Sequence, residues 1–209
     1  TWAGDTRSTW EEMLACLRGG LSAGFNGDAF WGGDIAGFTG PEPSPELYIR
    51  WAQWGLLSPL ARFHGANSPR EPWYFGEQAV DVVKRYTQLR YRLIPYLKQC
   101  AQEAYTKGTP LLRHLHLEYP QDPTTIHIDD QFLLGPDLLV APVFEPGAIE
   151  RVVYLPGGSW ELLNSDLLPL RTLPGGHWHT VPAPLEDLPL FRRVGSTLPT
   201  DDSGRMNLE

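Results

Sequence analysis

The chain has 209 residues, 42% of them hydrophobic, which is enough for one large domain or two small ones with a sizeable core. Aspartate and glutamate outnumber lysine and arginine by 25 to 17, and the net charge of −8 argues against a protein that binds nucleic acid through a basic face. No apolar run approaches the roughly 18 residues of a membrane span, so we expect no membrane partner. The two cysteines, Cys16 and Cys100, are too few for a disulfide framework, and as free thiols they favour a reducing, cytoplasmic compartment.

The N-terminal segment reads as a strand tip followed by a capped helix. Residues 2–4 fit the end of a strand, and Asp5 stands directly after them. Thr9, with Glu12 three positions later, forms a capping box, so we predict a helix over about residues 9–20 that a glycine pair stops. In βα folds the strand tips carry the chemistry, because the scaffold fixes them while their loops vary. Asp5 is therefore a candidate catalytic acid.

The same order of strand, tip residue, loop and helix follows twice more. The tip residues of these units are Asp34 and His64. The last helix is long, and it should kink at Pro95 and end at Gly108. The predicted strand and helix of the second unit cover residues 23–35 and 45–57, and those of the third cover 58–65 and 77–107. This pattern is typical of an α/β fold, either a βα barrel or a doubly wound sheet.

After Gly108 the pattern changes to strands separated by proline, glycine and aspartate turns. We predict an antiparallel β-sandwich there. The chain thus divides into residues 1–108 and residues 109–209. The strand-like segments are residues 109–120, 131–144, 151–163 and 177–185. Three βα units cannot close a barrel, which needs eight and roughly 250 residues.

The three strand tips carry an acid or a histidine, each beside aromatic residues. Carboxylates among exposed aromatics suit carbohydrates, because sugar rings offer apolar C–H faces while their hydroxyls need polar partners. Glycosidic cleavage uses two carboxyl groups, one protonated and one ionised. Each residue also has a plainer interpretation: a loop aspartate as a cap, a tryptophan near glycines as core, a lone histidine as structural. The set comprises Asp5, Asp34 and His64, with Trp2, Trp31 and Phe38 beside them.

Two histidine pairs have a spacing that could bring two metal ligands together on a strand. His114 and His116, and likewise His177 and His179, would share one face of a predicted strand. No nearby cysteine or spaced histidine and glutamate set completes either pair. We therefore predict surface histidines and no metal.

Several segments together resemble the family 31 glycoside hydrolases, which are α-glucosidases and α-xylosidases. The resemblance runs from Trp2 to about Leu163 and more weakly to Leu198. It implies the C-terminal portion of a (β/α)8 TIM barrel, about strands six to eight with their helices, followed by an antiparallel β-sandwich domain. The segments that carry it are WAGD, STWEEM, GGLSAGFNGDAFWGGDIAGF, ELYIRWAQWGLLSPLARFHG, PREPW, LRYRLIPYL and DDQFLLGPDLLVAPV.

The resemblance implies a role for each candidate residue. Asp5 matches the general acid/base of the family. Asp34 and His64 match positions that contact sugar hydroxyls, and Arg62 resembles an arginine that orients Asp5 or Asp34. Trp2, Trp31 and Phe38 fall where aromatic residues wall the sugar subsites. The implied partner is an oligosaccharide, and we expect no cofactor. A homo-oligomer is one state open to the full-length protein.

The chain departs from the family pattern in one important respect. The family's nucleophilic aspartate lies in a W-x-D-M-x-E type motif that does not occur here, and a substrate-binding arginine is also missing. We therefore expect a fragment of a retaining, exo-acting α-glycosidase, inactive by itself and truncated at its C-terminal end. The alternative is a non-catalytic carbohydrate-binding or interaction module built on the β domain.

Overall fold

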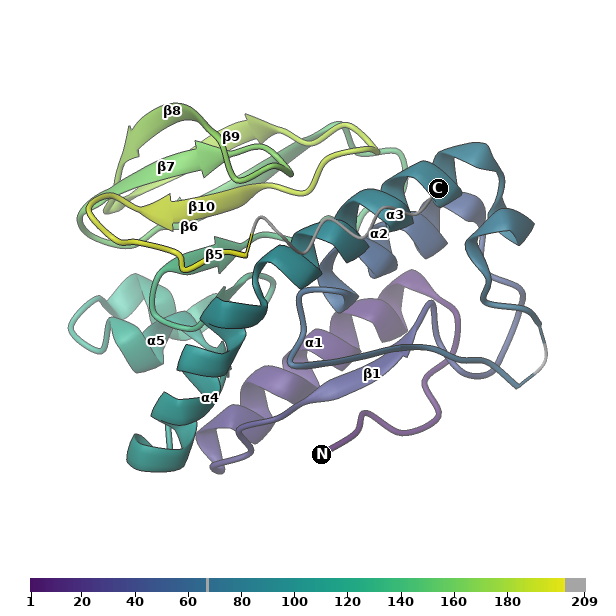
Figure 1. Ribbon diagram of the computed structural model, residues 1–209, viewed down its shortest axis with the longest axis horizontal. Helices are drawn as coiled ribbons and strands as arrows, with labels where there is room; N and C mark the ends of the chain where they lie inside the picture. Colours follow the sequence, from purple (N-terminus) through teal and green to yellow (C-terminus); the bar gives the residue numbers. More distant parts are fainter. Residues whose placement is uncertain (67, 202–209) are drawn as a thin grey trace.

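The computed structural model describes residues 1–66 and 68–201. Its N-terminal part is a small parallel sheet covered by helices (Figure 1). Strand β1 (Gly32–Ile35) pairs in parallel with β2 (Leu60–Phe63), and Trp2 adds a parallel bridge to Gly32. A helix follows each segment: α1 (Trp10–Phe25), α2 (Pro45–Gly55) and α3 (Glu77–Arg92). The predicted repeat of strand and helix is therefore present, and within this chain the barrel is not closed.

Helix α1 begins as predicted but does not end at the glycine pair. The Thr9 hydroxyl accepts a hydrogen bond from Glu12 N and caps the first turn. The prediction that the glycines stop the helix is wrong, because they serve packing instead. A Cβ on Gly20 would lie 2.5 Å from Trp31 Cδ1, so the absent side chain makes room for the indole. Since α1 continues to Phe25, the strand predicted over residues 23–35 shortens to β1.

The predicted long helix is two helices that meet at Leu93. Helix α3 ends there, and α4 (Ile94–Lys107) begins with Pro95 in its first turn. Proline lacks the N–H that would continue the α3 ladder, so the expected kink becomes a break. Gly108 ends α4 in the left-handed conformation, with φ at +75°, as predicted.

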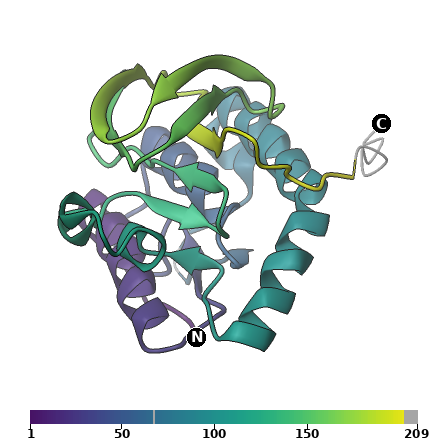
Figure 2. The same ribbon diagram turned by 90° about the vertical axis from the view of Figure 1, so that its left-hand side faces the viewer.

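The C-terminal part is built from antiparallel strands. The strand order is β3-β4-β5-β10-β7-β8 in a six-stranded sheet, and β6 pairs with β9 in a second sheet. In Figure 1 the strands β5 to β10 lie together in the upper left, with α1, α2, α3 and α4 below them and to their right, and Figure 2 shows the green and yellow strands at the top. The strands are β3 (Leu112–Arg113), β4 (Phe132–Leu134), β5 (Leu138–Val140), β6 (Glu150–Leu155), β7 (Ser159–Leu163), β8 (Pro169–Pro174), β9 (His177–Pro182) and β10 (Leu190–Arg193).

The two faces of the six-stranded sheet bury different cores. On one face, Leu133, Leu139 and Phe191 pack with residues of the β6–β9 pair. On the other face, Leu134 and Leu138 join the core that the helices bury. Alternation along each strand produces this division, since successive side chains point to opposite faces. The helical part thus shares one core with the sheet. The domain division after residue 108 stays a prediction, and residues 202–209 of the second predicted domain lie outside the described residues.

The segment predicted as a strand over residues 109–120 is mostly something else. Only β3 is extended there, and α5 (Leu115–Glu118) follows it. His114 caps α5, because its Nδ1 accepts a hydrogen bond from His116 N. The expectation that these two histidines share a strand face is wrong. Short 3₁₀ turns lie at η1 (Pro72–Phe75) and η2 (Pro123–His127). In the part of the chain that the structure describes, no helix combines the length and apolar character that crossing a membrane requires.

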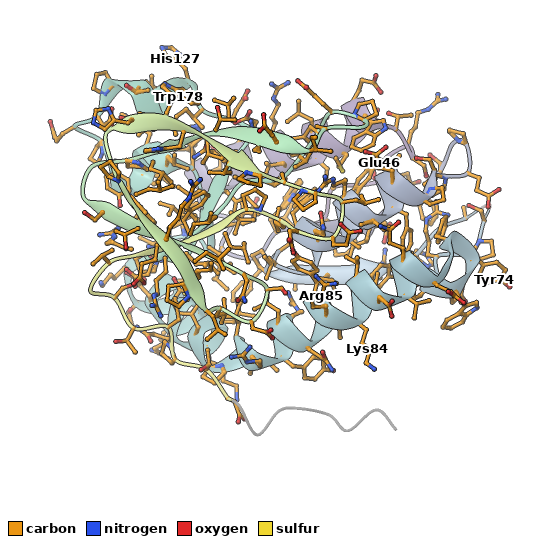
Figure 3. The ribbon with its side chains drawn as sticks, turned by 90° about the horizontal axis from the view of Figure 1, so that it is seen from above. Glu46, Tyr74, Lys84, Arg85, His127 and Trp178 are labelled. Carbon is orange, nitrogen blue, oxygen red and sulfur yellow. The ribbon has the colours of Figure 1, made fainter. Side chains whose placement is uncertain are left out.

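Helix α2 joins the helical part to the β part through polar contacts. The Arg50 side chain is 1% exposed, and its guanidinium donates to four backbone carbonyls beyond residue 147. Glu46, labelled in Figure 3 at the start of α2, accepts a hydrogen bond from Gly147 N at 2.6 Å. The carbonyls that Arg50 contacts belong to Ala148, Ala183, Pro184 and Asp187.

Candidate active site

The loops that follow the three strand segments are hydrogen-bonded to one another. Phe38 N and Thr39 N donate to Thr6 O at 2.8 and 3.0 Å. The Thr39 hydroxyl donates to Asp5 O at 3.3 Å, and Ala66 N donates to Phe38 O at 2.8 Å. The loop after β1 therefore connects the Asp5 loop to the loop that begins with His64. All three strand tips lie at the same end of the sheet.

Asp5 is exposed on its loop. Among the described residues, no side chain forms a hydrogen bond or ion pair with its carboxyl group, while its backbone oxygen is held by Thr39. A carboxyl group on a fixed backbone with a free side chain can reach a bound molecule. It can therefore give up or accept a proton at this end of the sheet.

Asp34 has the opposite environment, because its side chain is only 2% exposed. Its Oδ1 accepts a hydrogen bond from Arg62 Nε at 2.7 Å, across the β1–β2 register. The Arg62 guanidinium also lies 4.4 Å over the Trp2 ring, and Trp2 Nε1 is 3.5 Å from Asp34 Oδ2. Buried charge needs such pairing, since desolvation disfavours a lone carboxylate. Of the two aspartates that Arg62 was predicted to orient, the guanidinium contacts Asp34.

Phe38 and His64 stand together at the edge of the same site. Their ring centroids are 5.2 Å apart with an interplanar angle of 28°, which is a stacked arrangement. His64 is exposed, and Phe38 is half-buried. The two residues offer a ring face and an imidazole side by side, one apolar and one able to hydrogen-bond.

Trp31 does not join this group. Its ring is 9% exposed, belongs to the main core and contacts α1 at Gly19 and Gly20. Side chains alternate along a strand, so Trp31 faces the helix layer while Asp34 faces the other side of the sheet. We correct the prediction that Trp31 walls a sugar subsite: in this structure it packs in the core.

Arg70 was not among the predicted site residues, yet it contacts all three loops. It is 5% exposed, and its Nε and Nη2 donate to Gly37 O at 3.0 and 2.9 Å. Nη2 also donates to Ser8 Oγ at 3.0 Å, and Nη1 donates to Ser68 O at 3.0 Å. Its only sequence signal is an arginine in the stretch PREP, which fits an ordinary turn equally well.

The described residues contain no group of three or more histidine, cysteine, aspartate or glutamate side chains arranged to hold a metal ion. The rings of His177 and His179 lie 6.5 Å apart on β9, nearly perpendicular to each other. The side chains described at the strand tips carry carboxyl, imidazole, guanidinium and aromatic groups.

Comparison with known families connects this geometry to an enzyme class. The model described as the glycosyl hydrolases family 31 TIM-barrel domain matches residues 1–100, and the family 31 C-terminal domain model matches residues 108–198. The chain belongs to glycoside hydrolase family 31. The open sheet of three strand segments is thus part of a TIM-barrel domain, and the family is one of glycosidases.

Relatives in this family are named after different activities. Alpha-glucosidase 2 of Bacillus thermoamyloliquefaciens is 39% identical over 98% of the chain, which spans 26% of that protein. An alpha-xylosidase of Emericella nidulans is 41% identical over 95% of the chain and 26% of its own length. The family 31 dextranase of Flavobacterium johnsoniae, solved with glucose and as a mutant with isomaltotriose, has a TM-score of 0.89 at 40% identity. That match covers 95% of this chain and 26% of the dextranase. The chain therefore spans about a quarter of these relatives.

Proposed function

We propose that this chain supplies the acid/base part of a retaining α-glycosidase that removes terminal α-linked glucose or xylose from oligosaccharides. The observation that carries the proposal is the linkage of the three strand-tip loops. It places an exposed carboxyl group, Asp5, at the same end as the Asp34–Arg62 pair and the Phe38–His64 stack. Family membership and the names of the relatives support the reaction class.

In a retaining glycosidase two carboxyl groups stand about 5–5.5 Å apart. One attacks the anomeric carbon while the other protonates the leaving oxygen, so a covalent glycosyl-enzyme forms. We assign the proton transfer to Asp5. In the second half of the reaction Asp5, now a carboxylate, takes a proton from the water that attacks the glycosyl-enzyme. The nucleophile would come from a part of the protein outside these 209 residues, because the motif that carries it in the family is absent from them.

The remaining residues hold the sugar in this proposal. Asp34 is fixed through Oδ1 by Arg62. Among the described residues, Oδ2 has only the 3.5 Å contact to Trp2 Nε1, so it keeps acceptor capacity for a hydroxyl. His64 offers a second polar group, and the Phe38 ring offers an apolar face. A reducing compartment, proposed from the two free and buried cysteines, stays a prediction.

The activity is tested on the full-length protein that carries this chain. We expect hydrolysis of maltose or of isoprimeverose, and proton NMR of the first product should show the α-anomer before mutarotation. Release of the β-anomer would contradict the retaining mechanism. Binding of oligosaccharide without any hydrolysis, by a full-length protein that contains a W-x-D-M motif, would favour the carbohydrate-binding module instead.

A further inference from the structure

The guanidinium of Arg70 is buried without forming an ion pair with any described residue. Its acceptors are backbone carbonyls and the hydroxyls of Ser8 and Ser68. Burying a charge without a counter-charge costs free energy. What the buried guanidinium provides is fixed positions, because this rigid planar group can hold several hydrogen-bond acceptors in place at once.

The contacts of Arg70 lead directly to the backbone of Asp5. Ser8, which accepts from Arg70, is 3% exposed and donates from its N–H to Thr39 O at 2.9 Å. Thr39 in turn donates to Thr6 O and, through its hydroxyl, to Asp5 O. One end of this path is the guanidinium, and the other is the residue that carries the exposed carboxyl group.

The loop after β1 fits against the Asp5 loop too closely to move independently. Gly37 accepts two hydrogen bonds from Arg70 and has φ at +78°. A Cβ on Gly37 would lie 2.7 Å from Ser8 N, so the two backbones are in direct contact there. Phe38 follows Gly37 and stacks on His64. A shift at Gly37 would therefore displace the Asp5 loop and the aromatic edge of the site together.

We propose that Arg70 is a positioning residue for proton transfer: by joining the three strand-tip loops it sets where the Asp5 carboxyl group stands relative to the bound glycoside. This proposal rests on the acid/base role of Asp5 proposed above. It predicts a loss that depends on the leaving group. Cleavage of a disaccharide needs a proton on the leaving oxygen, whereas a glycosyl fluoride departs with little help. A donor that is misplaced should therefore harm the first reaction and spare the second.

The test uses Arg70→Lys in the full-length protein. Lysine keeps the charge and loses the fork, so it cannot hold Gly37 O and Ser8 Oγ together. We measure kcat/KM, which reports formation of the glycosyl-enzyme, for the disaccharide that the enzyme hydrolyses and for the matching α-glycosyl fluoride. A misplacement of about 1 Å can cost on the order of 100-fold, so we expect a loss of about 10- to 100-fold on the disaccharide and little change on the fluoride.

Arg50→Lys is the matched control. Arg50 is also a buried arginine that donates to backbone carbonyls, but among the described residues none of its hydrogen-bond acceptors belongs to a strand-tip loop. Its variant should leave the ratio of the two kcat/KM values unchanged. Ser8→Ala removes a single hydroxyl contact at the Asp5 end, and it should shift the ratio in the same direction as Arg70→Lys by a smaller factor. It keeps the proposal testable if Arg70→Lys does not fold.

Asp5→Ala supplies the reference that separates this proposal from the proposed function. If Arg70 acts through Asp5, adding Arg70→Lys to Asp5→Ala should not change the ratio further. Equal loss on both substrates in Arg70→Lys and Ser8→Ala, beside a selective loss in Asp5→Ala, would overturn the role of Arg70 alone. If Asp5→Ala itself is not selective, the acid/base assignment fails, and the positioning role fails with it.

Discussion

Replacing Arg50 with methionine should weaken the attachment of α2 to the β part. Methionine fills the space of the aliphatic stem but removes one hydrogen bond from each of four carbonyl oxygens, of which Pro184 O keeps the bond from Asp187 N. The Ala183 contact is buried at 2.7 Å, and the contacts to Ala148, Pro184 and Asp187, at 3.0–3.1 Å, are partly buried. Because the Ala183 contact is buried, water should reach that carbonyl least once the guanidinium is removed, while the other three contacts are already partly open to water.

The magnitude follows from these contacts. An orphaned buried carbonyl costs about 1–3 kcal/mol, and partly buried ones cost less because water can replace the donor. Removing the buried guanidinium also removes its desolvation cost, which offsets part of the loss. We therefore expect a loss of about 2–4 kcal/mol in the free energy of unfolding. With an m-value of about 2 kcal/mol/M, the urea midpoint would fall by roughly 1–2 M.

The control is Arg85→Met, on the neighbouring helix α3 (Figure 3). Arg85 reaches the same loop through a 3.4 Å contact to Glu186 O and a 3.5 Å ion pair with Asp187, and its side chain is 35% exposed. An exposed pair of this kind contributes about 0–1 kcal/mol. Tryptophan fluorescence in urea compares the two variants of the full-length protein. If Arg50→Met unfolds at the same midpoint as Arg85→Met, the buried contacts of Arg50 stabilise the protein no more than a surface contact does, and the reasoning fails.

Three further predictions concern the core and the sugar site. Gly20→Ala should destabilise the protein by about 1–3 kcal/mol despite the better helix propensity of alanine, because the added Cβ would overlap the Trp31 ring. A melting temperature at or above that of the unmodified protein would contradict this, and Trp31→Phe should restore part of the lost stability. Burial raises the pKa of Cys16 to about 12, so iodoacetamide at pH 8 should label this thiol only in denaturant, and labelling of the native protein would contradict the burial. The stability that the buried thiol contributes is present below the ordinary thiol pKa and should be lost as the pH rises toward 12. Arg62→Met should lower kcat/KM equally for a disaccharide and a glycosyl fluoride, because it disturbs Asp34 and not the proton donor; a loss confined to the disaccharide contradicts this assignment.

Local patterns predict most of the helices and the strand-tip positions. The Thr9 cap and the end at Gly108 depend on neighbouring residues and were predicted from them, and Pro95 was predicted to kink the helix that it breaks. The side of the sheet to which the side chains around β1 point was harder to predict. Trp31 directly precedes β1, and Asp34 lies three positions later in it, so the two side chains face opposite sides. An aromatic residue among glycines does not reveal which of these sides is the core.

Two features depend on contacts that no local pattern contains. The glycine pair of α1 locally predicts the end of a helix, yet the Trp31 ring occupies the space that a Cβ on Gly20 would take. Tertiary packing therefore overrides the local signal. Arg70 contacts Gly37 and Ser8, which are 33 and 62 positions away in the chain. Its role becomes visible only when the three loops are placed side by side.

The acid/base assignment is tested most directly by Asp5→Ala in the full-length protein. The substitution removes the proton donor and leaves the nucleophile in place. Loss on maltose or isoprimeverose should be about 10²–10⁴-fold or more, which is the usual contribution of general acid catalysis. Formation of the glycosyl-enzyme from an α-glycosyl fluoride should survive, its hydrolysis should slow for want of a base, and added azide should restore turnover. Equal loss on both substrates with no effect of azide would make Asp5 a structural residue and contradict the assignment.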